Sequence, residues 1–282
     1  MAVKLSGKEL ASSLKEALKE AIAKGVAEGK RQPTLASVMV GEDGGSLSYI
    51  KGQKKVSEEL GIKYHMKILS SSITEEELIE EIKGLNSDEE VDGIIIQLPL
   101  PAHLNEDKIL SHISVDKDVD GLTDMNFGRF CKGQQSFIPC TARSVLKLIK
   151  STGEKLEGKK TVVLGRSNIV GKPAAMLLLK ENTTVTQCHS KTKNMKEICR
   201  DADILICAMG KPAYIKEDFI KAGAIVIDVG TTMVEGKVRG DVDFEPVSQV
   251  AGYVTPVPGG VGAMTTTMLM ENTYEAWLKN VY

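Results

Sequence analysis

The feature that most constrains this chain is a regular alternation of short apolar runs with segments of helical periodicity. The stretch at 92–98, DGIIIQL, is almost continuously apolar, which is typical of a strand buried on both faces of a parallel sheet. Parallel strands need long crossover connections, and helices are the usual ones. This βαβαβ order predicts a parallel sheet covered by helices. Its predicted strands lie at 34–41, 63–69 and 92–98, and its helices cover 48–61 and begin after Ser6, Thr74 and Asn105.

A second series of the same kind starts after a loop region at 114–140. Thr141 is predicted to cap a helix that Gly153 closes, and Pro173 stands in the first turn of a later helix, where its missing N–H costs nothing. The pattern predicts a doubly wound, Rossmann-like sheet, followed by a last helix at 263–280. Its strands are expected at 160–165, 183–188, 203–210 and 224–230, and the helices between them at 172–182, 195–202 and 216–223.

The composition of the 282-residue chain is that of a globular protein long enough for two domains. Its net charge of −2 gives no reason to expect nucleic acid or an anionic membrane as a partner, and its longest apolar run is too short to cross a bilayer. The first ten residues contain no signal-peptide core. The five cysteines form no CxxC pair, which predicts reduced thiols in a cytosolic protein without a disulfide framework or a bound metal.

The segment VVLGRSNIVGKP has the form of a phosphate-binding turn. It contains a strand, a turn with Gly165 and Gly171, and the start of a helix. Ser167 stands where the second glycine of a GxGxxG motif would be, so taken alone the signal is weak and an ordinary glycine-rich loop would look similar. Its place at the opening of a βαβ unit favours a nucleotide site.

The end of the following strand indicates which nucleotide would bind. Sites that prefer NAD usually place an acid there to hold the ribose 2′-hydroxyl. Here Cys188 is followed by His189, Ser190 and Lys191, so this segment contains no acidic residue that would repel a 2′-phosphate. Arg166 in the preceding turn could clamp such a phosphate through two parallel hydrogen bonds. The sequence therefore predicts NADP rather than NAD.

Three further segments are candidates for the second ligand. Gln97 lies at the end of the strand at 92–98, on the edge where open α/β sheets bind ligands. The loop at 256–262, PVPGGVG, could let a flat ligand approach its glycines or could be a structural turn. A cluster of acids suits a solvated loop or a metal site, although its spacing does not match a calcium loop. The cluster consists of Asp116, Asp118, Asp120 and Asp124.

The segments SYIKGQKKVSEELGI, IIIQLPLP, KDVDGLT, FIPCT, VVLGRSNIVGKP, CHSKT and TPVPGGVG occur together in the order and spacing of one family. Over nearly its full length the chain resembles the methylenetetrahydrofolate dehydrogenase/methenyltetrahydrofolate cyclohydrolase family of the bacterial FolD type. The resemblance implies an NADP-dependent enzyme of one-carbon metabolism that oxidises 5,10-methylenetetrahydrofolate, as a cytoplasmic homodimer. It implies a folate-binding catalytic domain at 1–122 plus 263–282, a connecting segment at 123–140, an NADP-binding domain at 141–262, and folate in the cleft between them.

The resemblance also implies the residues of the site. Tyr49 would stack on the pterin, and Asp120 would hydrogen-bond the pterin amino edge. The implied catalytic residues are Tyr49, Gln53, Gln97 and Asp120. The implied substrate-binding residues are Tyr49, Gln97, Leu98, Pro99, Asp120, Pro258, Gly259 and Gly260. The implied cofactor-binding residues are Gly165, Arg166, Ser167, Ser190 and Thr231.

One departure from the family pattern concerns the helix that carries Tyr49. The family has its main cyclohydrolase lysine four residues later, whereas this chain has Gln53 there and keeps Lys55. Residues four apart share a helix face, and neither Lys51 nor Lys54 faces the same way. Hydride transfer needs alignment but no side-chain acid or base, whereas hydrolysis of the methenyl cation needs proton transfer, which an amide does not perform. We therefore expect a working dehydrogenase with a weak or absent cyclohydrolase.

Three alternatives remain open from the sequence. In the first, the enzyme is fully bifunctional, and Lys55, or a water held by Gln53 and Asp120, performs the proton transfer. In the second, the chain is a non-catalytic regulator that binds NADP or folate. In the third, it is an unrelated dehydrogenase of a small hydroxy acid, for which His189 is the candidate base near the cofactor.

Overall fold

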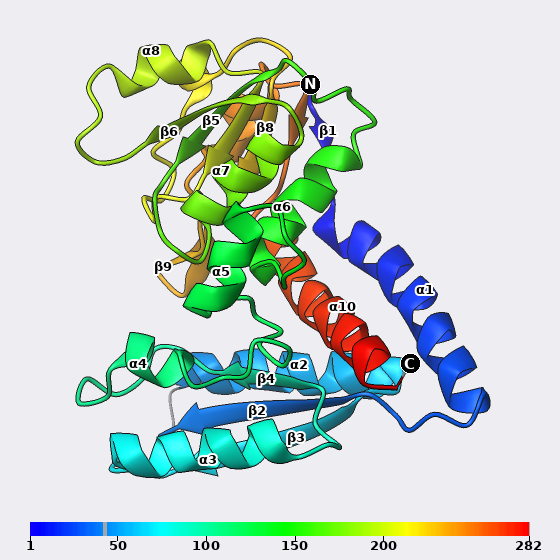
Figure 1. The fold of residues 1–282 in the computed structure, drawn as a ribbon. Coiled ribbons are helices and arrows are strands. Elements are labelled where there is room, and N and C mark those ends of the chain that lie inside the picture. The colour runs from blue at the N-terminus through cyan, green and yellow to red at the C-terminus, as the bar shows by residue number, and fades with distance from the viewer. Residues whose placement is uncertain (42–43, 282) are drawn as a thin grey trace. The chain divides into compact units, whose positions relative to one another are not determined.

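The computed structural model describes residues 1–41 and 44–281, and the chain divides into two units (Figure 1). Unit 1 contains Met1–Ser13 and Pro139–Thr265, and unit 2 contains Leu14–Ile138 and Thr266–Tyr282. The domain boundaries expected from the sequence differ from these units mainly at the N-terminus. Strand β1 (Val3–Lys4) pairs in parallel with β11 (Tyr253–Val254), and this pairing places the first residues in the sheet of unit 1.

The sheet of unit 2 has three parallel strands in the order β3-β2-β4. They are β2 (Thr34–Val40), β3 (Lys63–Leu69) and β4 (Gly93–Ile96), as the sequence predicted within a few residues. Leu35 of the central strand lies opposite Tyr64 on one side and Gly93 on the other. Every residue of β2 is buried, because it has a neighbouring strand on each edge and helices over both faces.

Helices on opposite sides of this sheet connect its strands (Figure 1). Helix α2 (Gly44–Leu60) links β2 to β3, and α3 (Glu75–Ser87) links β3 to β4. Helix α3 begins after Thr74, as predicted, with a capping box in which Thr74 accepts from the Glu77 N–H and the Glu77 carboxylate accepts from the Thr74 N–H. The face covered by α3 and α4 (Glu106–Leu110) is a continuous apolar core. The face toward α2 carries polar groups.

Unit 1 contains six parallel strands in the order β1-β11-β8-β7-β5-β6. The strand order reverses at β5, because β6 lies on one side of it and β7 on the other. Such a reversal is the usual ligand-binding position of an open α/β sheet. The predicted Rossmann-like sheet is therefore confirmed. Its central strands are β5 (Lys160–Leu164), β6 (Thr184–Cys188), β7 (Ile204–Cys207) and β8 (Ile225–Asp228).

The helices of unit 1 differ in detail from the prediction. Helix α6 (Cys140–Lys150) begins two residues earlier than predicted, with Pro139 at its N-cap, so Thr141 is not the cap. The segment expected to be helical at 216–223 forms only a short 3₁₀ turn, η1 (Glu217–Phe219). Elements that the sequence did not predict are α5 (Asp124–Cys131), α9 (Phe244–Ser248) and the hairpin of β9 (Thr232–Val234) with β10 (Lys237–Arg239). Helices α7 (Gly171–Lys180) and α8 (Met195–Arg200) match the prediction.

The last helix, α10 (Val261–Val281), packs its C-terminal half in unit 2, as predicted. Trp277 is fully buried, and its indole N–H donates to the backbone carbonyl of Arg31 at 2.9 Å. The ring lies against Gly25 of α1 (Gly7–Ala27), where a Cβ would stand only 2.4 Å from it. A glycine at this position of α1 therefore permits the close packing of the two helices.

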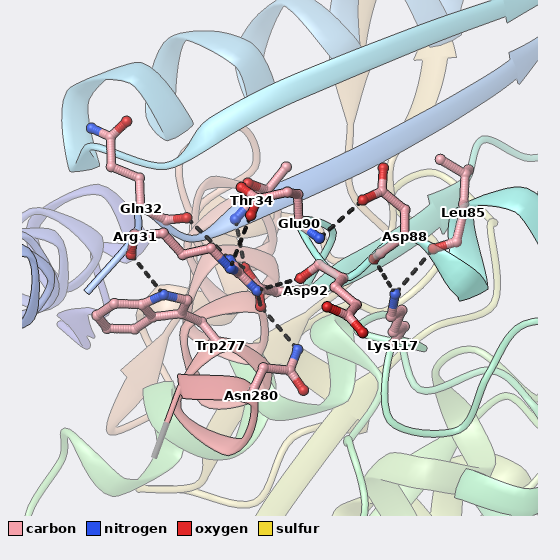
Figure 2. Close-up of polar contacts among 11 residues, drawn as sticks. Arg31, Gln32, Thr34, Leu85, Asp88, Glu90, Asp92, Lys117, Trp277 and Asn280 are labelled. Carbon is pink, nitrogen blue, oxygen red and sulfur yellow. Dashed lines mark hydrogen bonds and ion pairs between the residues drawn. The ribbon is translucent and has the colours of Figure 1, made fainter.

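An ion pair with a buried carboxylate joins this helix to the start of two strands (Figure 2). The guanidinium of Arg31 holds both carboxylate oxygens of Asp92, at 2.7 and 2.8 Å, and the Asp92 side chain has no exposed surface. Asp92 also accepts from the Thr34 N–H and from the side-chain amide of Asn280. Figure 2 shows Arg31, Thr34 and Asn280 converging on this carboxylate, which links the beginnings of β2 and β4 to the end of α10.

Candidate active site

A cavity of about 610 Å³ opens in unit 1 at the carboxyl ends of β5, β6 and β7. Gly165 follows β5, His189 and Ser190 follow β6, and Ala208 follows β7. The cavity therefore lies at the point where the strand order reverses. It is lined by Gly165, Arg166, Ser167, His189, Ser190, Thr192, Asn194, Met195, Lys196, Glu197, Ala208, Met209, Lys211, Tyr214 and Phe219.

The turn after β5 needs both of its glycines. Gly165 has φ of 126°, and a Cβ there would lie 2.2 Å from the carbonyl oxygen of Ala208. A Cβ on Gly171 would lie 2.4 Å from the carbonyl oxygen of Gly165. Ser167 takes part in the turn, since its hydroxyl accepts from the N–H groups of Val170 and Gly171 at 3.2 and 3.4 Å. The tight turn places Gly165, Arg166 and Ser167 in the cavity lining, directly before α7.

Four of the five predicted cofactor residues line this cavity, and Thr231 does not. Thr231 lines a second cavity of unit 1, of about 280 Å³, together with Pro258, Gly259 and Gly260. The loop from Pro256 to Gly262 thus shares a pocket with a residue that was assigned to the cofactor. The assignment of Thr231 to the cofactor therefore stays a prediction.

Two buried aspartates shape these cavities, and the sequence analysis missed both. Asp241 accepts from the N–H groups of Met209, Gly210 and Lys211 at 2.6 to 3.1 Å, and so orders the loop after β7. Asp228 lines the second cavity. Burial raises the pKa of Asp228 to about 6, although three backbone N–H groups donate to it and oppose that rise. An aspartate directly after the apolar run IVI was the available signal.

In unit 2, Gln53 and Gln97 are in direct contact. The side-chain amide of Gln97 donates to the Gln53 Oε1 at 3.1 Å and to the Ser37 hydroxyl at 3.0 Å. The Tyr64 hydroxyl donates to the same Gln53 oxygen at 2.8 Å. Gln53 has no exposed surface and Gln97 is 6% exposed. The predicted pair is therefore part of a buried polar cluster of four side chains.

Tyr49 lies one helical turn before Gln53 and is 39% exposed. Leu98 is partly buried, Pro99 is exposed, and the peptide bond between them is cis. Lys55 is exposed on α2.

The acidic cluster divides into residues with different roles. Asp118 is 1% exposed and accepts hydrogen bonds from three backbone N–H groups, the Thr123 hydroxyl and the Asn126 side chain. It therefore organises the turn that carries Asp120, which is partly buried. Asp116 and Asp124 are exposed. Within residues 1–41 and 44–281, no three His, Cys, Asp or Glu side chains are grouped to hold a metal ion.

The thiols of the described chain form no disulfide, and four of the five are buried. Burial raises the pKa of Cys199 to about 12, so this thiol keeps its proton at neutral pH. In the described part of the chain, no helix is long and apolar enough to span a membrane.

Two family models match the chain. Residues 5–120 match the catalytic domain of tetrahydrofolate dehydrogenase/cyclohydrolase, and residues 139–281 match the NAD(P)-binding domain of the same family. A protein of Clostridium tetani named bifunctional protein FolD is 52% identical over 277 residues, which cover 98% of this chain and 100% of that protein. The protein of that name from Clostridium acetobutylicum is 54% identical over 272 residues, covering 96% and 98%.

Solved structures match over the same length. The crystal structure of the bifunctional FolD enzyme, methylenetetrahydrofolate dehydrogenase/cyclohydrolase, from Campylobacter jejuni has a TM-score of 0.97 and 44% identity, covering 99% of each chain. The N5,N10-methylenetetrahydrofolate dehydrogenase-cyclohydrolase of Trypanosoma brucei, complexed with NADP cofactor and inhibitor, has a TM-score of 0.95 and 36% identity, covering 99% and 98%.

Proposed function

This chain belongs to the tetrahydrofolate dehydrogenase/cyclohydrolase family, and we propose that it performs both reactions of that name with NADP as the oxidant. The dehydrogenase step oxidises 5,10-methylenetetrahydrofolate to the 5,10-methenyl cation. The cyclohydrolase step opens that cation with water to 10-formyltetrahydrofolate. The observation that carries the proposal is the match of both family domains, in order, over residues 5–120 and 139–281, together with the cavity at the strand reversal of unit 1.

The residues around the 610 Å³ cavity fit a dinucleotide with a 2′-phosphate. The two glycines allow the backbone to approach a pyrophosphate, and no acid follows β6. Arg166 and Ser190 are exposed at the cavity and can hold the extra phosphate. When bound, the nicotinamide supplies the acceptor for the hydride. The chain itself aligns the folate and excludes water, since this step needs no side-chain proton transfer.

Arg166 should therefore decide cofactor choice. Replacing Arg166 with alanine is expected to raise the KM for NADP by about 10- to 100-fold, because a charge-assisted hydrogen bond to phosphate is worth about 1.5–3 kcal/mol. The KM for NAD should change by less than about twofold, since NAD lacks that phosphate. Steady-state kinetics with both cofactors measure the difference.

The control for this experiment is Arg200→Ala, which removes an exposed arginine at the end of α8, outside the cavity lining. It should leave both KM values unchanged. Equal losses with NADP and NAD in Arg166→Ala would mean that Arg166 maintains the turn and does not select the phosphate.

The expected loss of cyclohydrolase activity is not supported by the comparisons. Relatives that are 52% and 54% identical over nearly the whole chain bear the name bifunctional, and they favour the first alternative. Lys55 is exposed and lies two residues, about 200° of helix rotation, beyond Gln53. A water held by the Gln53 amide is therefore the better-supported route, with the Asp120 carboxylate as the group that accepts its proton.

Assaying both reactions on the unaltered chain tests this proposal. Methenyltetrahydrofolate should be hydrolysed well above its uncatalysed rate, and Gln53→Lys should change that rate by less than about tenfold, because the proton passes to another group. A different pair of results would refute the bifunctional proposal and support a dehydrogenase-only enzyme. In that case the methenyl product accumulates, and Gln53→Lys raises its hydrolysis rate about 10²- to 10⁴-fold.

The assembly and location of the protein are part of the same proposal. The resemblance to the family supports a homodimer of cytoplasmic subunits. Sedimentation of the purified chain at assay concentration would measure the subunit number directly.

A further inference from the structure

Tyr64 is the one member of the buried polar cluster in unit 2 that carries a phenolic hydroxyl, and the proposed function gives it no role. Its hydroxyl donates to the Gln53 Oε1 at 2.8 Å, and the Gln97 amide donates to the same oxygen at 3.1 Å. The cluster is completed by Ser37, which accepts from Gln97. Tyr64 therefore contacts the residue on which the water-binding route of the proposed function depends.

The two donors reach Gln53 from different ends of the sheet. Tyr64 is the second residue of β3 and lies opposite Leu35, near the amino ends of the strands. Gln97 follows the last residue of β4, at the carboxyl ends where open α/β sheets bind ligands. Tyr64 therefore approaches Gln53 from the side remote from that edge, as a support for the amide.

The hydroxyl of Tyr64 acts as a donor throughout the neutral range. Burial raises the pKa of Tyr64 above its ordinary value, and a hydrogen bond with Ser37 only partly opposes that rise. An amide oxygen that accepts two hydrogen bonds has little freedom to rotate.

The nitrogen of the Gln53 side-chain amide differs from its oxygen. The Gln53 Nε2 is buried and has no hydrogen-bond partner among the residues that the structure describes. An unpaired buried donor is unfavourable, so an acceptor that reaches it gains binding energy. The amide of Gln53 thus has a satisfied oxygen and an unused donor.

We propose that Tyr64 is a positioning residue of the folate site, which fixes the Gln53 amide so that its Nε2 donates to an acceptor atom of the folate or of the attacking water. This inference rests on the proposed function and adds a residue that the family resemblance did not imply. The residue would act through Gln53 and would not contact the reacting atoms.

The test uses Tyr64→Phe in the full chain, because this change removes one oxygen and keeps the ring. The dissociation constant for folate and the dehydrogenase KM should each rise about fivefold, as expected for one lost hydrogen bond, with kcat within about twofold. The dehydrogenase reaction is the readout because it does not depend on proton transfer at position 53. Gln53→Met should raise the same constants at least as much.

The decisive measurement is the combination of the two variants. In the Gln53→Met background, Tyr64→Phe should add less than about twofold, because the hydroxyl then has no amide to hold. The matched control is Tyr253→Phe in β11 of unit 1, which should leave folate binding unchanged. A Tyr64→Phe effect of equal size with and without Gln53, or no effect at all, would overturn the inference.

The outcomes separate this inference from the proposed function. An unaltered chain that does not oxidise methylenetetrahydrofolate with NADP overturns the proposed function, and the inference with it. An active chain in which Tyr64 and Gln53 act independently overturns only the inference. If Tyr64→Phe does not fold, unchanged folate binding in Gln53→Met still overturns the inference, because the Gln53 amide would then have no role for Tyr64 to support.

Discussion

The Asp118→Ala variant is expected to lose most of its folate turnover and about 3 kcal/mol or more of its free energy of unfolding. The carboxylate is buried, and removing it leaves several donors without partners, each at a cost of about 1–3 kcal/mol. These donors are the N–H groups of Leu122 and Thr123 and the Thr123 hydroxyl, whereas the Gly121 N–H keeps the Asp118 backbone carbonyl and the Asn126 amide keeps the Val115 carbonyl. Chemical denaturation and the dehydrogenase assay measure the two losses.

The turnover of Asp118→Ala should fall by more than the loss of folded protein explains, because the same turn carries Asp120. Gly121 has φ of 69° and a Cβ there would lie 2.8 Å from the Phe137 carbonyl oxygen, so the turn has one tight conformation. Without Asp118 that conformation loses its central acceptor, and Asp120 is no longer held in place. Asp116→Ala, on an exposed side chain two residues away, is the matched control and should be within about 0.5 kcal/mol of the unaltered chain. Equal denaturation midpoints for the two variants would contradict this account.

The Arg31→Ala variant should lose about 3–5 kcal/mol of its free energy of unfolding, because it leaves the buried Asp92 carboxylate without its ion pair. The Thr34 N–H and the Asn280 amide remain as donors but carry no charge. Arg31→Lys should recover part of the loss, since lysine supplies the charge but not the two parallel hydrogen bonds. Urea denaturation at neutral pH measures both variants.

Lys19→Ala on the exposed side of α1 is the control for Arg31→Ala, and it should change the midpoint little. A similar small change in Arg31→Ala would mean that the ion pair of Figure 2 contributes nothing net to stability. The contribution of this ion pair to stability matters for function because Asp92 immediately precedes β4, and Gln97 follows the same strand.

Much of the candidate site could be predicted because its signals are local. The glycines of the turn after β5, the missing acid after β6 and the position of Gln97 at a strand end depend on short stretches of chain. Family resemblance added Tyr49 and Asp120, which no periodicity would have singled out. The role of Asp118 was not predicted, since a buried acceptor and a solvated acid look alike in a cluster of four aspartates.

The short helix expected at 216–223 is a case in which the local pattern predicted the wrong structure. Its periodicity suited a helix, yet the chain forms only a 3₁₀ turn at Glu217–Phe219. In the folded protein Ile215 instead bridges to Val242 and Tyr214 packs on Phe219, so tertiary contacts override the local preference.

The sequence by itself determined the central strands and helices of both parallel sheets and the nucleotide turn, because these depend on the periodicity and turn chemistry of neighbouring residues. The resemblance of its motifs added the family. Only the tertiary structure decided that Tyr64 supports Gln53, that Arg31 pairs with Asp92 and that Trp277 bonds to the Arg31 carbonyl. The last two contacts join residues 61 and 246 positions apart, and no local pattern encodes which distant groups meet. Burial makes these contacts important for stability, because a polar group removed from water needs a hydrogen-bond partner within the fold.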